Sequence, residues 1–428
     1  MTLKDMLGRS GVMSREDALN VLLAHVRAPL LHSETCAISD VLGRVLAEEI
    51  LSPQDLPEFD RSTMDGYAVR SADTFGAAES RPALLTLVGD IPMGACSSRV
   101  LAKGELMKIA TGGALPAGAD AVVMFEQTQP VDSVSIEVVK PVAPLENVVQ
   151  IGDDIKKGEI ILSPGHRMRP QDMGALAGVG IMRIRVYEKP RVAIINTGNE
   201  IVPADTIPGP GQVRDINSYN LEGLIRQTGG IPVKKGIIPD DYDQLRTAFD
   251  GAIKDCALVL VTGGSSVGTA DLTERVINDA GKPGVLVHGV SIKPGKPLII
   301  ACIDAQNKNT PVFGLPGHPA AVSICFELFV KPVLLRMSGE VALPALGGVA
   351  PARIVQARLA RSISSGPGRE DHVRVMLEQK DGVLWARPIF GASGLISTLV
   401  KAAGTVVVPM NSIGIDSGEQ VDVRLFNG

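Results

Sequence analysis

The chain has 428 residues, of which 45% are hydrophobic and 21% charged, and this composition excludes an extended disordered protein. At roughly 150 residues per domain, two or three domains are expected. The net charge of -5 excludes a general affinity for nucleic acid or for anionic membranes, so an anionic ligand must be held by local positive groups. Scattered cysteines, the lack of a secretion signal and the lack of a long apolar run predict a cytoplasmic protein without a disulfide framework or a zinc site.

The N-terminal part of the chain predicts a discontinuous helical domain that surrounds a β-rich insertion. Residues 14–28 carry apolar side chains at helical spacing behind a capping-box start, and a second helix is expected at Ile38–Ile50. Short Val/Ile/Leu-rich runs between Gly/Pro turns predict an all-β domain over residues 53–149. Residues 150–187 contain a helical stretch, and we expect them to return to residues 1–52 and complete one domain.

Residues 188–338 alternate between strand and helix patterns. The strand candidates are Val192–Asn196, Val233–Ile238, Leu258–Thr262, Val285–Val287, Leu298–Ala301 and Val312–Leu315. Apolar strands separated by amphipathic helices predict a mostly parallel sheet that binds its ligand beyond the carboxyl ends of the strands. Residues 339–428 return to short strands and predict a small β-barrel. The expected fold class is therefore a multidomain protein of α/β and β parts.

A glycine-rich loop, TGGSSVGTAD, follows one of these strands and precedes a helix. Its glycines Gly263, Gly264 and Gly268 let backbone N–H groups approach an anion, and Ser265 and Ser266 add hydroxyl donors. The loop lacks the spacing of a P-loop or a dinucleotide fingerprint, so by itself it predicts only an anion site.

Several charged residues near the predicted strand ends are candidate partners of that anion site. Asp271 is either the N-cap of the following helix or a group near a metal-bound phosphate. Lys293 and Lys296 flank a Pro-Gly turn, where two fixed ammonium groups would neutralise an oxyanion or pyrophosphate. Glu200 and Asp240, together with Asp271, are the carboxylates that would hold Mg²⁺.

Other motifs do not discriminate between a structural and a functional role. His318 in GLPGHP is a candidate ligand or base, but a structural turn residue is the simpler interpretation. FDRSTMDGYAVR and ATGGALPAGAD are turns of the β-rich segment, and their composition alone fits a scaffold as well as a site.

Taken together, the motifs FDRSTMDGYAVR, ATGGALPAGADAVV, NTGNEIV, TGGSSVGTAD, IKPGKP and GLPGHP resemble, in this order and spacing, those of the molybdopterin molybdenumtransferases. This family comprises the bacterial MoeA proteins and the E domain of gephyrin. The resemblance covers the chain from about residue 14 to residue 428. It implies a four-part subunit that forms homodimers and inserts molybdate into adenylylated molybdopterin with release of AMP and with Mg²⁺.

The resemblance also assigns roles to individual residues. Asp65 and Thr111 match active-site residues that reach the site from the partner subunit. Glu200, Asp240 and Asp271 match the acidic residues of the α/β domain. Ser266 and Lys293 match residues of the anion pocket, and Arg374 and Ser393 match residues of the last domain that face molybdate. Candidate partners are a molybdopterin adenylyltransferase and the molybdoenzyme apoproteins, with no nucleic acid and no membrane.

The chain departs from the usual family motifs at Ser265, Gly289 and His318, and Ala320 and Ala321 stand where a serine is frequent. These differences affect the anion pocket and bear on the preference between molybdate and tungstate. Two alternatives remain at this point: a molybdopterin adenylyltransferase, which shares the α/β domain, and a non-catalytic scaffold that keeps a pterin pocket.

Overall fold

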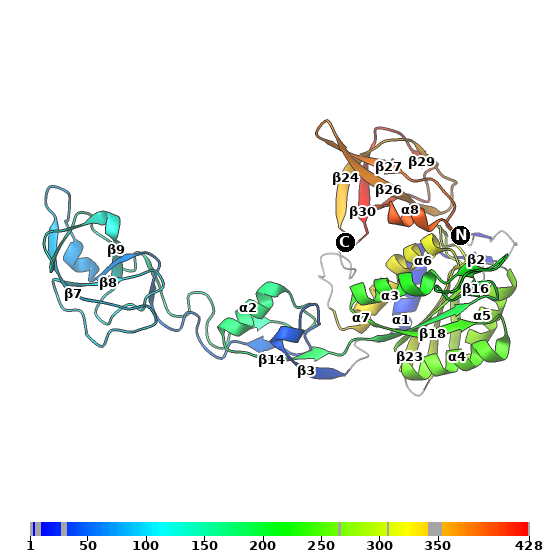
Figure 1. Cartoon of the computed structure of the whole chain (residues 1–428), viewed down its shortest axis with the longest axis horizontal. Coiled ribbons are helices and arrows are strands. Elements are labelled where there is room, and N and C mark those ends of the chain that lie inside the picture. Colours follow the sequence, from blue (N-terminus) through cyan, green and yellow to red (C-terminus); the bar gives the residue numbers. More distant parts are fainter. Residues whose placement is uncertain are drawn as a thin grey trace.

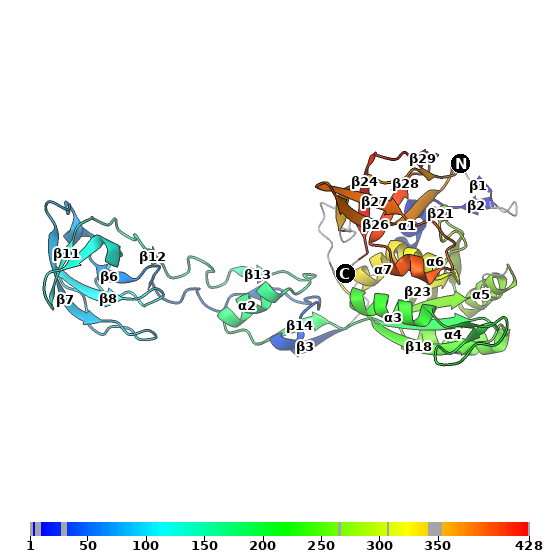
Figure 2. The same ribbon diagram turned by 45° about the horizontal axis from the view of Figure 1, so that its top comes forward.

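The computed structural model describes residues 3–4, 10–26, 32–263, 267–305, 308–340 and 353–426. The molecule is elongated: a β module lies at one end, an α/β module with a β-barrel lies at the other, and a small connecting module lies between them (Figure 1, Figure 2). The predicted multidomain architecture of α/β and β parts is therefore confirmed. Within the described residues, no helix is long and apolar enough to cross a membrane.

The α/β module is built on a six-stranded sheet in the order β18-β15-β19-β23-β22-β20. Its strands are β15 (Arg191–Thr197), β18 (Ile231–Ile238), β19 (Leu258–Gly263), β20 (Pro283–His288), β22 (Ile299–Ala305) and β23 (Lys308–Leu315). The first four strands in this order are parallel, whereas β22 is antiparallel to both of its neighbours. The predicted mostly parallel sheet is confirmed.

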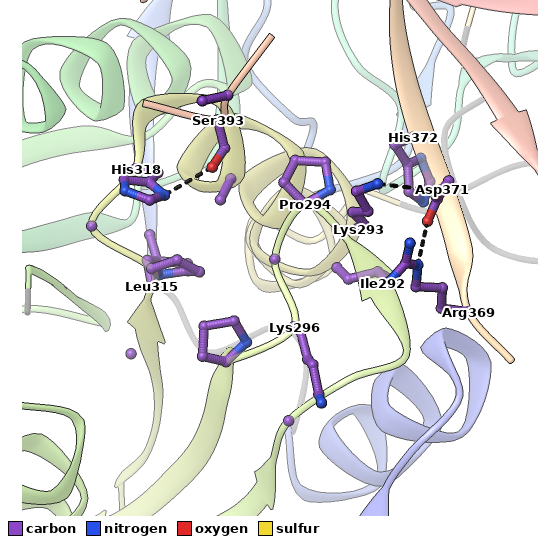
Figure 3. Close-up of a pocket in the computed structure, with 18 of the residues that line it drawn as sticks. Ile292, Lys293, Pro294, Lys296, Leu315, His318, Arg369, Asp371, His372 and Ser393 are labelled. Carbon is purple, nitrogen blue, oxygen red and sulfur yellow. Dashed lines mark hydrogen bonds and ion pairs between the residues drawn. The ribbon is translucent and has the colours of Figure 1, made fainter. Parts of the chain in front are cut away.

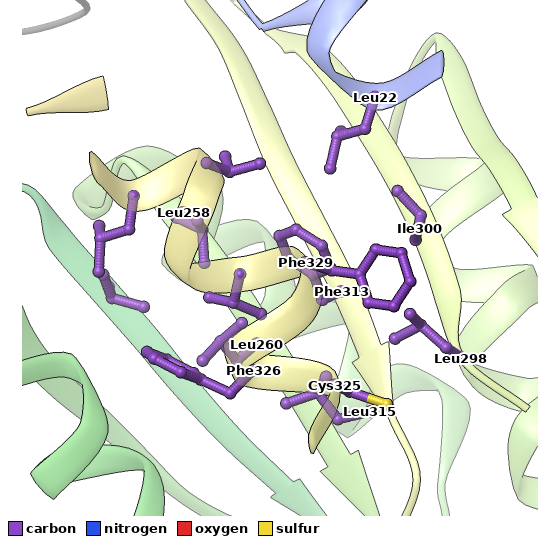
Figure 4. Close-up of a cluster of buried hydrophobic side chains, with 14 of the residues drawn as sticks. Leu22, Leu258, Leu260, Leu298, Ile300, Phe313, Leu315, Cys325, Phe326 and Phe329 are labelled. Carbon is purple, nitrogen blue, oxygen red and sulfur yellow. The ribbon is translucent and has the colours of Figure 1, made fainter. Parts of the chain in front are cut away.

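Helices cover both faces of this sheet because consecutive side chains of each strand point to opposite faces. The helices are α1 (Arg15–His25), α3 (Asn217–Thr228), α4 (Tyr242–Asp255), α5 (Val267–Ala280), α6 (Pro319–Cys325), the π-helical segment η4 (Phe326–Val330) and α7 (Lys331–Met337). Leu258 and Leu260 join one hydrophobic cluster with Phe313 (Figure 4), while Val259 and Val261 join a second cluster on the opposite face. Burial of each such side chain contributes roughly 1.5–3 kcal/mol.

Helix α1 begins as predicted but packs in a different place. The Ser14 side chain accepts a hydrogen bond from Asp17 N at 3.1 Å, which caps the helix. Leu22 is fully buried in the same cluster as Phe313 and Ile300 of the α/β sheet (Figure 4). The predicted grouping of this helix with residues 150–187 is therefore wrong, because the apolar face of α1 completes the α/β core.

The connecting module is discontinuous in sequence, and it contains fewer helices than predicted. Its elements are β3 (Ser33–Ala37), η1 (Ile38–Asp40), β4 (Ile50–Leu51), β13 (Ile160–Leu162), α2 (Pro170–Gly178) and β14 (Arg183–Tyr187). The predicted helix at Ile38–Ile50 is not formed: Gly43 has φ 71°, and Leu46 N and Ala47 N donate to carbonyls of the returning segment at 2.9 Å each. Pairing with the returning chain satisfies these backbone groups in place of helical bonds.

The β module forms a six-stranded sheet in the order β10-β11-β7-β8-β6-β9. Its strands are β6 (Gly66–Val69), β7 (Ala83–Asp90), β8 (Glu105–Ile109), β9 (Ala121–Met124), β10 (Thr128–Pro130) and β11 (Ser135–Val138), with turns η2 (Ser71–Thr74) and η3 (Phe125–Gln127). Beside it, β5 (Arg61–Ser62) pairs with β12 (Val148–Val149). The predicted all-β insertion is confirmed.

The C-terminal strands close into a five-stranded barrel, because β26 pairs with both β27 and β28. The barrel strands are β24 (Ile354–Leu359), β26 (Glu370–Lys380), β27 (Val383–Pro388), β28 (Gly404–Val408) and β30 (Gln420–Leu425), and α8 (Ile396–Val400) lies beside them. A short strand of the α/β module, β21 (Ile292–Lys293), adds to β26 in parallel. The barrel is therefore joined to the α/β module by backbone pairing.

A charged contact reinforces this junction. Arg15 Nε donates to Glu370 Oε2 at 3.0 Å, and His372 Nε2 lies 3.4 Å from the same oxygen. His372 contributes most to lowering the pKa of the Glu370 carboxyl, from 4.5 to about 2; burial opposes this, and Arg15 adds to it. The contact therefore stabilises the fold fully above pH 4.5, and this contribution is lost as the pH falls towards 2.

We expect Glu370→Gln to lower the free energy of unfolding by about 1–2 kcal/mol near neutral pH, because it leaves buried His372 and Arg15 without their carboxylate. The difference from wild type should shrink as the pH falls from 4.5 towards 2. Urea unfolding over this range measures both effects. Glu378→Gln is the control, because Glu378 lies on the same strand as Glu370 and pairs with the exposed Arg387 of the neighbouring strand β27; it should cost less. Equal losses in the two variants would contradict a special role of this junction.

Candidate active site

A cavity of about 840 Å³ lies between the α/β module and the barrel (Figure 3). This volume suits a cofactor-sized ligand. The α/β side is lined by the end of β19, part of α5, the turn after β21 and the loop after β23, and the barrel side by the start of β26 and the loop before α8. The predicted site residues that line this cavity are Gly263, Asp271, Lys293, Lys296, Arg374 and Ser393.

Gly263 shapes the part of the cavity that adjoins the glycine-rich loop. Its φ is 139°, and a Cβ atom there would lie 1.7 Å from the carbonyl oxygen of Thr197, so only glycine fits. Gly264, Ser265 and Ser266 lie outside the described residues, and Gly268 lies in the first turn of α5. Asp271 is the fifth residue of that helix and is exposed, so the alternative that it is the N-cap is wrong.

The turn after β21 carries the two predicted lysines into the cavity. Its backbone is held on one side by the pairing of Lys293 with Asp371 of β26. On the other side, Gly295 packs so closely on buried Cys325 that an added Cβ would lie 2.7 Å from the Sγ atom. The ammonium groups of Lys293 and Lys296 are therefore presented by a rigid turn.

Asp371 is a buried carboxylate in the wall of this cavity. Its Oδ1 accepts from Arg369 Nε at 2.8 Å, and its Oδ2 lies 3.6 Å from Lys293 Nζ (Figure 3). The Asp371 side chain is only 4% exposed, whereas that of Lys293 is 58% exposed. Asp371 therefore contacts the charged groups of both Arg369 and Lys293, and both of these side chains line the cavity.

Arg374 differs from these cations because no carboxylate contacts it within the described residues. Its guanidinium donates to Thr398 Oγ1 at 2.7 Å and to the carbonyl oxygen of Gly391 at 3.0 Å, and its buried Nε has no hydrogen-bond partner in the described part of the chain. Burial lowers the pKa of Arg374. A buried cation without a counter-charge in a cavity wall is arranged to receive an anion.

His318 and Ser393 meet across the junction of the two modules. His318 Nδ1 and Ser393 Oγ are 2.8 Å apart (Figure 3), and Ala320 N donates to the carbonyl oxygen of Ser393 at 3.1 Å. The turn residue His318 thus contacts a predicted site residue, a contact that the sequence did not indicate.

Glu200 and Asp240 lie at the carboxyl edge of the same sheet but do not line the interdomain cavity. Asp240 Oδ1 accepts from Thr197 Oγ1 at 2.8 Å, and Asp240 N donates to Asn199 Oδ1 at 3.2 Å. A second cavity, of about 730 Å³, adjoins this loop. Among the described residues no three His, Cys, Asp or Glu side chains form a metal-binding group, so the predicted metal set of Glu200, Asp240 and Asp271 is not assembled as a ligand cage.

Asp65 and Thr111 lie in the β module, at the opposite end of the molecule from the cavity (Figure 2). Thr111 donates to Asp65 Oδ1 from its backbone N at 2.7 Å and from its hydroxyl at 3.0 Å. The backbone hydrogen bond first, and the hydroxyl second, lower the pKa of the exposed Asp65 carboxyl, which keeps it ionised. Neither residue contacts the cavity of its own subunit.

Sequence reasoning missed several residues that line the cavity. His288 Nδ1 and Glu274 Oε2 are 2.7 Å apart in its wall, although β20 and α5 gave no motif that pairs them. Asp371 could have been predicted as a site residue from its position in the EDHVR segment, three residues before Arg374.

Comparisons with known proteins bear on nearly the whole chain. Residues 13–180 match the MoeA N-terminal region (domain I and II), residues 193–336 match a probable molybdopterin binding domain, and residues 356–426 match the MoeA C-terminal region (domain IV). The chain is 31% identical to the molybdopterin molybdenumtransferase of Bacillus subtilis over 92% of its own length and 90% of that protein. It is 32% identical to the corresponding protein of a Nostoc species over 89% and 85% of the two chains.

Solved structures give the same result for the fold. The crystal structure of the molybdopterin biosynthesis MoeA protein from Pyrococcus horikoshii is 33% identical, with a TM-score of 0.82, and the match covers 97% of this chain and 100% of that chain. The four-part fold, the cavity between the α/β module and the barrel, and these matches agree, and the chain belongs to the MoeA family of molybdopterin molybdenumtransferases.

Proposed function

We propose that this protein is a cytoplasmic molybdenum insertase, which transfers molybdate into adenylylated molybdopterin and releases AMP. The observation that carries the proposal is the buried guanidinium of Arg374, which faces the cavity without a carboxylate partner in the described part of the chain. The names of the relatives support the choice of substrate class.

The donors around the cavity suit a tetrahedral dianion such as molybdate. Arg374 supplies a fork of N–H donors, Ser393 a hydroxyl, and Lys293 and Lys296 ammonium groups. These groups stand in place before the substrate arrives, so they stabilise developing negative charge without reorganisation. The sulfurs that receive the metal belong to the substrate, so no nucleophilic cysteine of the protein is required.

We further propose that Mg²⁺ assists cleavage of the adenylyl phosphoanhydride. Mg²⁺ commonly takes one or two carboxylates and completes its coordination with substrate phosphates and water. Asp240 and Glu200 are the carboxylates that suit this mode of binding, because both lie at the loop Thr197–Glu200. The described residues contain no group of three carboxylates that would hold the ion without substrate phosphates. When bound there, the ion would offset the charge of the phosphoanhydride.

Asp65 and Thr111 require a second subunit if they take part in the reaction. Within one chain they lie far from the cavity, at the other end of an elongated molecule (Figure 1). We propose a homodimer in which the β module of one subunit approaches the cavity of the other, giving a composite site.

The proposal is tested by giving the purified protein adenylylated molybdopterin, Mg²⁺ and molybdate. AMP release that depends on molybdate is expected. AMP release that is independent of molybdate, or no release, would contradict the proposal. Adenylylation of free molybdopterin by ATP would instead identify an adenylyltransferase, and pterin binding without turnover would identify a scaffold.

A further inference from the structure

His318 lies at a point where its backbone is well determined. It precedes Pro319, the first residue of α6, and has an extended backbone with φ -78° and ψ 128°. Its carbonyl oxygen accepts from Ala321 N and Val322 N at 3.0 Å each. The imidazole lies on the α/β side of the cavity and faces the barrel loop that carries Ser393 (Figure 3).

That barrel loop is also tied down. Ser393 O accepts from Ala320 N at 3.1 Å, and Gly391 O accepts from the Arg374 guanidinium at 3.0 Å. Gly394 lies beside the imidazole: an added Cβ there would make an ordinary van der Waals contact, 3.6 Å from His318 Cδ2. One short loop thus connects the buried cation, the hydroxyl and the imidazole.

The 2.8 Å contact between His318 Nδ1 and Ser393 Oγ has two alternative polarities. A serine hydroxyl has one hydrogen and two lone pairs, and a neutral imidazole has one donor and one acceptor nitrogen. If Ser393 donates to His318, its only hydrogen is consumed, and an oxyanion would meet lone pairs. If Nδ1–H donates to Oγ, the hydroxyl hydrogen of Ser393 remains free for the oxyanion.

We infer that His318 is a positioning residue for the oxyanion substrate: its Nδ1–H donates to Ser393 Oγ and directs the Ser393 hydroxyl hydrogen into the cavity. This inference rests on the proposed function, because it takes molybdate as the anion that Ser393 receives. Anion binding selects the polarity in which Nδ1 carries the hydrogen, since only that state offers the extra hydrogen bond. His318 itself does not contact the anion.

The test compares His318→Ala, His318→Asn, Ser393→Ala and the double variant His318→Ala/Ser393→Ala in the full chain. An asparagine amide offers an N–H donor close to the position of Nδ1, so it retains the bond to Ser393. The KM for molybdate and the kcat of AMP release are measured for each protein. Val400→Ala, at an 81% exposed position of the adjoining α8, is the matched control.

We expect His318→Ala to raise the KM for molybdate about tenfold with little change in kcat, because one charge-assisted hydrogen bond loses its orientation. His318→Asn should restore the wild-type KM, and the double variant should be no worse than Ser393→Ala. A wild-type KM in His318→Ala, a failure of His318→Asn to restore it, or additive losses in the double variant would each overturn the inference. If wild-type AMP release does not depend on molybdate at all, the proposed function itself fails, and the two failures are thereby distinguished.

Discussion

Replacing Arg374 with methionine is expected to lower molybdate-dependent AMP release by about two orders of magnitude, the effect of losing one preorganised charged donor. Methionine preserves most of the buried stem but removes the guanidinium. Because burial already lowers the pKa of Arg374 and no carboxylate in the described part of the chain balances its charge, the substitution should change the free energy of unfolding by only about 1 kcal/mol.

The measurement pairs steady-state AMP release with urea unfolding. Arg387→Met is the matched control, because Arg387 is an exposed barrel arginine whose partner, Glu378, lies on the neighbouring strand, outside the cavity. It should leave the turnover rate unchanged. If Arg374→Met retains both kcat and KM, the buried guanidinium is not part of the anion site.

Mixing two inactive variants is expected to restore activity if the site is composite. Asp65→Asn disables the β module and Lys293→Met disables the cavity, so each homodimer should be inactive. In a mixed dimer, one of the two sites receives an intact cavity from one subunit and an intact β module from the other. Random assortment of equal amounts should recover about a quarter of the wild-type activity.

Co-expression followed by an AMP-release assay measures this recovery. A mixture of Asp65→Asn with Thr111→Val is the control, because both changes lie in the same β module and every site then lacks one of them. Recovery in the control mixture, or none in the test mixture, would contradict a site shared between subunits.

Local patterns in the sequence predicted the elements that local chemistry determines. The cap at Ser14 and the continuous apolar run of β19 were sufficient to place a helix and a strand. The failed helix at Ile38–Ile50 shows the limit of such patterns, since the backbone there bonds to a segment more than a hundred residues away. Periodicity identifies a face that will be buried but not the surface that buries it, and α1 was misplaced for this reason.

The site residues could likewise be predicted where the local sequence determines them, but not where distant segments meet. The glycine at position 263 and the lysines of the IKPGKP turn were predicted from their own segments. The pairing of β21 with β26 involves only two residues, so no periodic signal marks it, yet it brings Asp371 beside Lys293. Glu200, Asp240 and Asp271 do not form a preassembled group of three metal ligands in the described part of the chain, because sharing one edge of a sheet does not by itself bring side chains together. Which of them bind Mg²⁺ stays a prediction.

We expect the oxyanion substrate to bind between the α/β module and the barrel. The most direct measurement is a crystal structure with bound molybdate, in which anomalous scattering from molybdenum locates the ion without ambiguity. We predict a peak within hydrogen-bonding distance of the Arg374 guanidinium and the Ser393 hydroxyl. A peak only in the second cavity, beside Asn199 and Lys234, would contradict binding of the oxyanion at the junction with the barrel.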